Sequence, residues 1–383
     1  MLIYNNPRNI PAKRDVSVAQ HIYTLDLLRI FAAILVLLNH FAELKLSSSY
    51  YFDSISTAYN FLSIFDGIGS VGVEIFFVIS GFVITGSAER GYGKSFAFKF
   101  ALSRCKRLLP VLWISGLVSL LVRSIDNGFG IDLLIQYVRF AVLFPSGPYI
   151  DGVVWSLVVE SVFYIVIGFT ILSRHPQRFS RLAIILAGMS LFYNIIFIII
   201  YSSVDPYHSI AFAIINNFAF KVVLLKYGIF FALGMFIRSS FKKLNFYVKL
   251  TLVPSIFLLC LTEIFISSWN ISSFYATIKC SIWVAGVVWL FIVVKYDLPN
   301  FLSNRRVKTF VRWLGLISYP LYLNHYILGR FLTEKLESLD SVLRFVVVFF
   351  FIVCLSHIIE LLATKIISIE FRSKIDVVDK AIN

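Results

Sequence analysis

Long apolar stretches, separated by short polar segments, dominate the chain. A helix needs about 18–20 apolar residues to cross the hydrocarbon core of a bilayer. Ten windows of this kind occur, at residues 25–44, 70–87, 108–124, 153–173, 181–201, 221–238, 247–267, 277–295, 313–333 and 342–364. A further stretch, 131–145, is amphipathic, which favours an interfacial or re-entrant helix over an eleventh span. The pattern therefore predicts an all-α polytopic membrane protein with about ten transmembrane helices.

Composition supports the membrane class. The chain has 383 residues, of which 59% are hydrophobic and 15% are charged, whereas soluble domains have about 45–50% apolar and about 25% charged residues. No small-residue cleavage site follows the first apolar run, so we do not expect a removable signal peptide. We expect a single transmembrane domain over residues 25–365, between an N-terminal segment (1–24) and a tail (366–383). The cysteines show no metal-like or paired spacing and are expected to be packed free thiols: Cys105, Cys260, Cys280 and Cys354.

The Lys and Arg residues that give the chain its net charge of +14 are distributed unevenly among the loops. Lys and Arg are concentrated near both termini and in every second connection, at residues 88–107, 174–181, 238–249 and 295–312. The alternate connections are poor in Lys and Arg: residues 45–69, 125–152, 202–220, 268–276 and 334–341. Positive loops remain on the cytoplasmic side of a membrane, so both termini are expected there. The basicity reflects topology, and we expect no nucleic-acid partner.

The first apolar window contains ionisable side chains, which are costly in a membrane unless they are paired, hydrated or functional. Asp26 and Arg29 are three residues apart and can pair on one face of a helix. His40 follows Arg29 by eleven residues, which is close to three helical turns and about 16 Å of rise. Arg29 and His40 are therefore expected on the same face, near the cytoplasmic edge and in the outer half respectively.

Three further intramembrane groups are predicted at the depth of His40. Counting helical rise from the expected loops places Glu74, Glu160 and His325 in the outer half as well. A histidine paired with a carboxylate is a common arrangement for removing a proton from a hydroxyl group. We therefore expect His40 to act as a general base, oriented by Glu160 or Glu74. Structural hydrogen bonds between helices are the alternative interpretation of each group.

The segment RCKRLLP, which begins at Arg104, precedes the third window on the predicted cytoplasmic side. Arg104 and Arg107 share a helical face, and paired guanidinium groups suit phosphate oxygens. A phosphate-bearing cytoplasmic ligand is the functional interpretation, with Lys106 as a further contact. A plain topology anchor is the alternative.

Five segments, in this order, resemble the acyltransferase-3 family of integral membrane acyltransferases: LDLLRIFAAILVLLNH, GVEIFFVISGF, RCKRLLP, WSLVVESVFY and SYPLYLNH. They extend from about residue 25 to residue 326. One departure is visible, because Leu28 and Ile30 occupy positions where this family often has glycine. The polar positions of the first segment, Arg29 and His40, are retained.

The resemblance implies an enzyme of the bacterial inner membrane that moves an acyl group, by default acetyl, from cytoplasmic acetyl-CoA to a carbohydrate hydroxyl. An acceptor such as a lipopolysaccharide O-antigen would fit, and membrane lipid surrounds the protein. The resemblance implies that His40 is the essential histidine and that Arg104 and Arg107 bind the CoA. From its position at the cytoplasmic edge, we expect Arg29, with Asp26, to contact the CoA or to hold the lower part of the channel. We expect three further side chains around the acceptor: Trp155, Tyr322 and His325. No metal is expected, because a thioester is already activated.

Two points remain open from the sequence. His40 can act as a general base or carry the acyl group as a transient acyl-histidine. The same polar layer would also suit a glycan or lipid transporter. Two features favour the enzyme: the chain shows no inverted repeat, and its basic cluster adjoins one motif. A structural or assembly subunit is the least favoured interpretation.

Overall fold

The computed structural model describes residues 22–46, 56–202, 213, 217–243, 246–268, 273–295 and 304–382. Within these residues the chain is all-α, apart from two-residue strands β1 (Lys45–Leu46) and β2 (Ser56–Thr57), which pair antiparallel. All four cysteines are free, although Cys105 and Cys354 are exposed and not packed. The helices are α1 (Tyr23–Glu43), η1 (Asn60–Phe65), α2 (Val71–Ala88), α3 (Lys94–Asn127), α4 (Ile131–Ala141), η2 (Gly152–Val154), α5 (Trp155–Leu172), α6 (Arg178–Ser202), α8 (Phe218–Val222), α9 (Gly228–Lys243), α10 (Phe246–Ser268), α11 (Ser273–Lys295), α12 (Arg305–Asn324), α13 (Ile327–Lys335) and α14 (Ser341–Ile382).

Eight helices in the described residues are long and apolar enough to cross a membrane. They are α1, α2, α3, α5 with the preceding η2, α6, α10, α11 and α14. The protein is therefore a multi-pass membrane protein, with eight of the ten predicted windows in helices of this kind. The other two windows differ. Residues 221–238 are divided by a turn between α8 and α9, and residues 313–333 are divided between α12 and α13.

Two local features lie close to the division after α12. Pro320 lies inside α12 and cannot donate the backbone hydrogen bond of its position. The Asn324 side chain donates to the Pro320 carbonyl oxygen at 2.7 Å, and a turn at His325 and Tyr326 follows. The chain thus bends at the predicted His325 motif, so that motif lies at a helix end.

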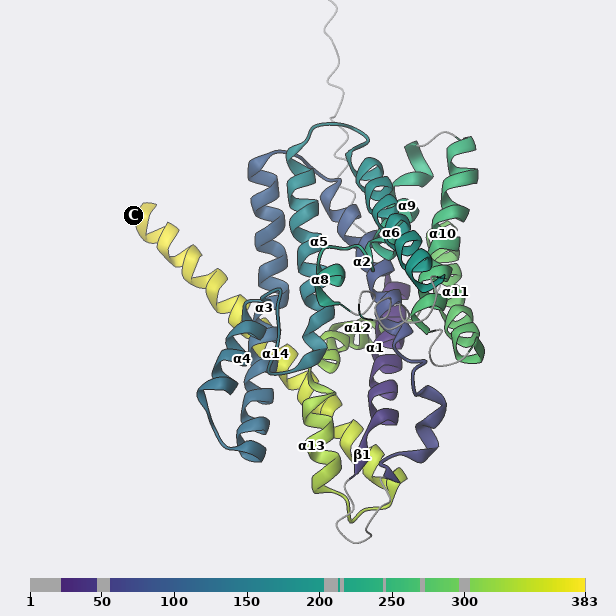
Figure 1. Cartoon of the computed structure of the whole chain (residues 1–383). Helices are drawn as coiled ribbons and strands as arrows, with labels where there is room; N and C mark the ends of the chain where they lie inside the picture. The colour runs from purple at the N-terminus through teal and green to yellow at the C-terminus, as the bar shows by residue number, and fades with distance from the viewer. Residues whose placement is uncertain are drawn as a thin grey trace, which may run out of the picture.

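The centre of the bundle is formed by α1, α2, α9 and α12 (Figure 1). Between Ile229 and Ile237 the hydrophobic side chains of α9 are at most 3% exposed, so this short helix is a core element. Gly81 of α2 and Gly234 of α9 let the two backbones meet, because a Cβ at either position would overlap a backbone carbonyl of the other helix. Small residues at such crossings are typical of membrane helices, where close packing replaces the hydrophobic effect.

The amphipathic stretch 131–145 forms α4, which has 11 residues and is too short to span a bilayer. Its Phe140 ring packs over Gly116 of α3 and is fully buried. The prediction that this segment is not an eleventh span is confirmed.

Candidate active site

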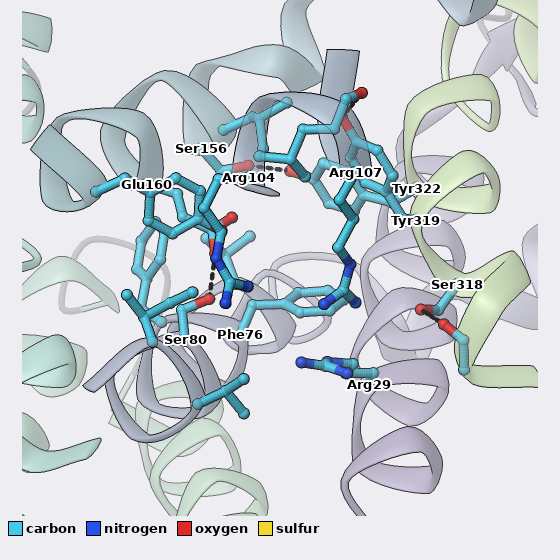
Figure 2. Close-up of a pocket in the computed structure, with 18 of the residues that line it drawn as sticks. Arg29, Phe76, Ser80, Arg104, Arg107, Ser156, Glu160, Ser318, Tyr319 and Tyr322 are labelled. Carbon is cyan, nitrogen blue, oxygen red and sulfur yellow. Dashed lines mark hydrogen bonds between the residues drawn. The ribbon is translucent and has the colours of Figure 1, made fainter. Parts of the chain in front are cut away.

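Three arginines from two helices line one cavity of about 330 Å³. Arg29 comes from α1, and Arg104 and Arg107 come from one face of α3. Figure 2 shows the three guanidinium groups pointing into the same space. The prediction that Arg104 and Arg107 share a face is therefore confirmed, and Arg29 joins them.

Each arginine is held differently. The Arg29 guanidinium lies 3.6 Å from the Asp26 carboxylate, as the i, i+3 spacing predicted. Arg104 donates to the Ser87 hydroxyl at 2.9 Å and lies over the Phe100 ring at 5.4 Å. Arg107 has no hydrogen bond or ion pair with the described residues, so its donors are available to a ligand.

Asp26 is held in place by a neighbouring helix. It is 4% exposed, and Gly315 of α12 packs directly against its carboxyl group. A side chain at position 315 would collide with that carboxylate. The close approach of α12 to α1 therefore fixes the acid that orients Arg29.

Glu160 of α5 forms the opposite wall of the arginine cavity. Its carboxylate accepts a hydrogen bond from the Ser80 hydroxyl and another, at 2.6 Å, from the Tyr164 hydroxyl. It interacts electrostatically with Arg29 and Arg104. Glu360 of α14 lines the same cavity and interacts with Arg107. Glu160 is thus a counter-charge to the arginines, whereas the sequence analysis placed it beside His40.

His40 lies in a separate cluster of aromatic and acidic groups near the end of α1. Its ring centroid is 5.2 Å from that of His325 and 4.9 Å from that of Tyr326. The acid beside His40 is Glu43, whose Oε2 lies 3.5 Å from His40 Nδ1. Glu43 also accepts a hydrogen bond from the Asn39 side chain. The rings of His40 and His325, which were predicted at one depth, lie close together, and the carboxylate beside His40 is Glu43 and not Glu160 or Glu74.

The two ring nitrogens of His40 have different surroundings. Nδ1 is buried and faces Glu43, while the side chain as a whole is 29% exposed. Nε2 is therefore the nitrogen that a substrate can reach. Nδ1 makes no hydrogen bond with the described residues, but the Glu43 carboxylate that faces it at 3.5 Å favours the tautomer with the lone pair on Nε2, as a general base requires.

His325 is 1% exposed and has a fixed tautomer. Its Nδ1 lies 2.7 Å from the carbonyl oxygen of Tyr322, and a carbonyl oxygen only accepts, so Nδ1 carries the proton of the neutral ring. Nε2 is buried without a hydrogen-bond partner among the described residues.

Tyr322 connects the histidine cluster to the arginine cavity. It lines the cavity, and its ring lies 5.8 Å from Phe76 and 5.7 Å from His325. Its hydroxyl is 2.7 Å from that of Ser156, and Figure 2 shows this bond at the cavity wall. Tyr322 therefore contacts both the cavity and His325.

Two predicted site residues lie outside this arrangement. Glu74 is buried but is not a lining residue of the arginine cavity, and it interacts with Lys279, Lys226 and Lys221 on the other side of α2. Trp155 packs against Tyr227 and lies under the Lys221 ammonium group at 5.0 Å. The structure brings together Arg29, Arg104, Arg107, Glu160 and Tyr322 in the cavity, and His40 with His325 beside it.

Sequence reasoning missed several members of the site. Asp151 is fully buried, and its carboxylate accepts from the Ile327 and Val153 backbone N–H groups at 3.4 and 3.1 Å, which fixes the start of α13 beside His325. The i, i+3 spacing from His40 was a signal for Glu43. Glu360 is an acid inside an apolar run and carried the same signal as Glu160. Nothing in the sequence indicated the hydroxyl groups of Ser80 and Tyr164.

Comparison with known proteins agrees with this geometry. The sequence model of the acyltransferase 3 family, described as an acyltransferase domain, matches residues 22–361. A curated relative, "Nodulation protein 10" of Rhizobium leguminosarum bv. viciae, is 28% identical over 193 residues, which cover 44% of this chain and 50% of the relative. The match thus spans half the length of that relative. No solved structure matches the chain.

Proposed function

The chain belongs to the acyltransferase 3 family of membrane acyltransferases, and we propose that it transfers an acetyl group from acetyl-CoA to a hydroxyl of a carbohydrate. An exported or cell-surface glycan, such as a lipopolysaccharide O-antigen, is the proposed acceptor. One observation carries the proposal: a cavity lined by three arginines and a pair of histidines both contact Tyr322. The more exposed histidine, His40, has the Glu43 carboxylate 3.5 Å from its Nδ1.

The arginine cavity is the proposed donor site. Guanidinium groups bind phosphate oxygens with paired, charge-assisted hydrogen bonds. Arg29, Arg104 and Arg107 present such donors from two helices, and Arg107 has no partner among the described residues. The diphosphate of CoA would bind here, with Glu160 and Glu360 holding the guanidinium groups in position.

The histidine cluster is the proposed acceptor and catalytic site. His40 Nε2 takes the proton of the acceptor hydroxyl as its oxygen bonds to the thioester carbonyl carbon. The carbon–sulfur bond then breaks, and the CoA thiolate receives the proton from the His40 imidazolium. Glu43, 3.5 Å from Nδ1, stabilises the imidazolium while it exists. His325, whose ring lies 5.2 Å from that of His40, would hold the His40 ring toward the acceptor.

The two sites fit a transfer across the membrane. Arg104 lies in the segment that the distribution of Lys and Arg assigns to the cytoplasm, and His40 lies three turns further along α1 than Arg29. We propose that both termini are cytoplasmic, in a bacterial inner membrane, so that the donor enters from the cytoplasm and the acceptor from the opposite side.

Membranes that contain the protein, [¹⁴C]acetyl-CoA and the host glycan provide the test. Wild-type protein should transfer label to glycan, and His40→Ala should abolish transfer while the protein remains inserted and folded. His357→Ala is a matched control, because His357 contacts Trp313 and lies outside the cavity. Wild-type activity in His40→Ala would contradict the proposed mechanism. Movement of glycan without any acetylation would indicate a transporter.

A further inference from the structure

A second cavity, of about 430 Å³, lies between two loops on the side of Arg104. One loop follows α2 and contributes Glu89, Arg90 and Tyr92, and the other precedes α6 and contributes His175 and Arg178. Both loops belong to the connections that the charge distribution assigns to the cytoplasm. The sequence analysis assigned no function to either loop.

Hydrogen bonds fasten the two loops to each other. Arg178 donates to the carbonyl oxygen of Gly91 at 2.6 Å and to that of Ser173 at 2.7 Å. The backbone N–H of Gly93 donates to the Ile171 carbonyl oxygen at 3.0 Å. The cavity is therefore formed before any ligand binds, which lowers the entropic cost of binding.

The lining combines cationic and aromatic groups. Arg90 is exposed and has no hydrogen bond or ion pair with the described residues. Arg174 lies over the Tyr92 ring at 5.2 Å, and Tyr92 lines the cavity. The acid in the lining, Glu89, is paired with Arg238 at 3.8 Å. This chemistry suits a phosphate beside a flat heteroaromatic ring.

Two further observations point to an anion. In the first turn of α6, the backbone N–H groups of Arg178 and Arg181 donate to the carbonyl oxygens of His175 and Gln177, whereas Phe179 and Ser180, which line the cavity, have no such bond among the described residues. Arg178 Nε is buried without a hydrogen-bond partner among the described residues. The backbone N–H groups of Phe179 and Ser180 are thus the donors that the lining offers in addition to Arg90.

The second cavity is close to the donor cavity. Ile84 lines the donor cavity and Glu89 lines the second, five residues and about 7–8 Å further along α2 and its C-cap. Arg104 lines the donor cavity, is hydrogen-bonded to Ser87 and interacts electrostatically with Arg90. The two cavities are therefore close enough for one elongated ligand to reach from one to the other.

We propose that the second cavity binds the 3′-phosphoadenosine portion of the acyl donor, with Arg90 on the 3′-phosphate and Tyr92 beside the adenine. This assignment rests on the proposed function. The arginine cavity then holds the diphosphate and the pantetheine arm. Arg90 would recognise a group that distinguishes CoA from its dephospho form, and Arg104 would recognise the diphosphate that both share.

The test compares two donors, acetyl-CoA and acetyl-dephospho-CoA, which differ only in the 3′-phosphate. Arg90→Ala should raise the KM for acetyl-CoA at least about tenfold, since a charge-assisted contact is lost. It should leave the KM for acetyl-dephospho-CoA at the wild-type value. Arg104→Ala should raise the KM for both donors. Arg181→Ala removes the same charge one turn into α6, outside both cavities, and should change neither KM.

Direct binding supplies a second measurement. Adenosine 3′,5′-bisphosphate should bind detergent-solubilised wild-type protein and the Arg181→Ala protein, and should bind Arg90→Ala at least about tenfold more weakly. Equal effects of Arg90→Ala on both donors, or unchanged binding of the bisphosphate, would overturn the assignment alone. A wild-type protein that uses neither donor would overturn the proposed function and this assignment with it.

Discussion

Replacing Glu43 by Gln tests whether the acid beside His40 supports catalysis. The substitution retains the size of the side chain and its hydrogen bond from Asn39 but removes the charge that faces His40 Nδ1. When His40 takes a proton, the carboxylate stabilises the imidazolium, and the amide does not. The loss should therefore appear in kcat, since the imidazolium exists only during the reaction.

The separation of 3.5 Å sets the magnitude. Two unit charges at that distance interact by about 1 kcal/mol in water and by about 5 kcal/mol at an effective dielectric constant near 20. The side chains of His40 and Glu43 are 29% and 45% exposed, so water screens much of the interaction. An effect of about 1–2 kcal/mol, or roughly 5- to 30-fold in kcat, is expected.

Steady-state acetyl transfer at saturating acetyl-CoA measures this loss. Glu334→Gln is the matched control, because Glu334 forms an exposed pair with Arg330 at 2.8 Å and should leave kcat unchanged. Glu160→Gln should instead raise the KM for acetyl-CoA, because Glu160 faces Arg29 and Arg104. Wild-type kcat in Glu43→Gln, with a large loss of kcat in Glu160→Gln, would refute the reasoning and restore Glu160 as the partner of His40.

Two other substitutions test the cavity wall and the core. Tyr322→Phe removes the 2.7 Å hydrogen bond to Ser156 but keeps the ring against His325, so we expect a loss of about 3- to 10-fold in kcat/KM. Tyr319→Phe is the control within the same cavity, because the Tyr319 hydroxyl donates to the Leu108 carbonyl oxygen at 3.3 Å. Equal losses in the two variants would argue against a special role for Tyr322. Gly234→Ala places a methyl group against the Val78 carbonyl and should destabilise the folded protein by about 1–3 kcal/mol, seen as a lower Tm in detergent. Gly168→Ala, in an open helical position, should leave the Tm unchanged or raise it, and the same decrease for both would contradict the packing argument.

Part of the site could be predicted from the spacing of residues along single helices. Asp26 and Arg29 pair as expected because i, i+3 neighbours on a helix always face each other. Arg104 and Arg107 line one cavity for the same reason. Helical rise also placed His40 and His325 at compatible depths, and their rings are in contact. These predictions depend only on the geometry of single helices.

The positions of Glu74 and Glu160 were predicted wrongly, because the sequence does not show how each helix is rotated about its axis. Glu74 and Glu160 were predicted beside His40 from their depth, but depth does not state which neighbour a side chain faces. Glu74 lies on the face of α2 toward Lys279 and Lys226, and Glu160 points toward Ser80 and the arginines. Only the packing of α2 against α9 and α5 fixes those directions.

The number of membrane-spanning helices was likewise predicted only in part. Hydropathy identified every long apolar run, since a bilayer imposes its thickness on each helix independently. It could not show that residues 221–238 and 313–333 are divided by turns, because both are apolar enough to pass as single helices. Such turns are tolerated inside a bundle where their backbone groups find partners in the protein: Leu225 N–H donates to the Phe220 carbonyl oxygen at 3.1 Å, and Arg330 N–H donates to that of Tyr326 at 2.9 Å.

The sequence alone therefore determined the membrane class, the positions of the apolar segments, the family resemblance and the same-helix pairs, because each depends on composition or on spacing along one helix. The tertiary structure alone decided that the arginines form one cavity with Glu160, that His40 lies beside His325, and that Tyr322 joins the two. These contacts join helices far apart in the chain. They depend on glycine-mediated approaches such as Gly315 against Asp26, whose partners no local pattern specifies.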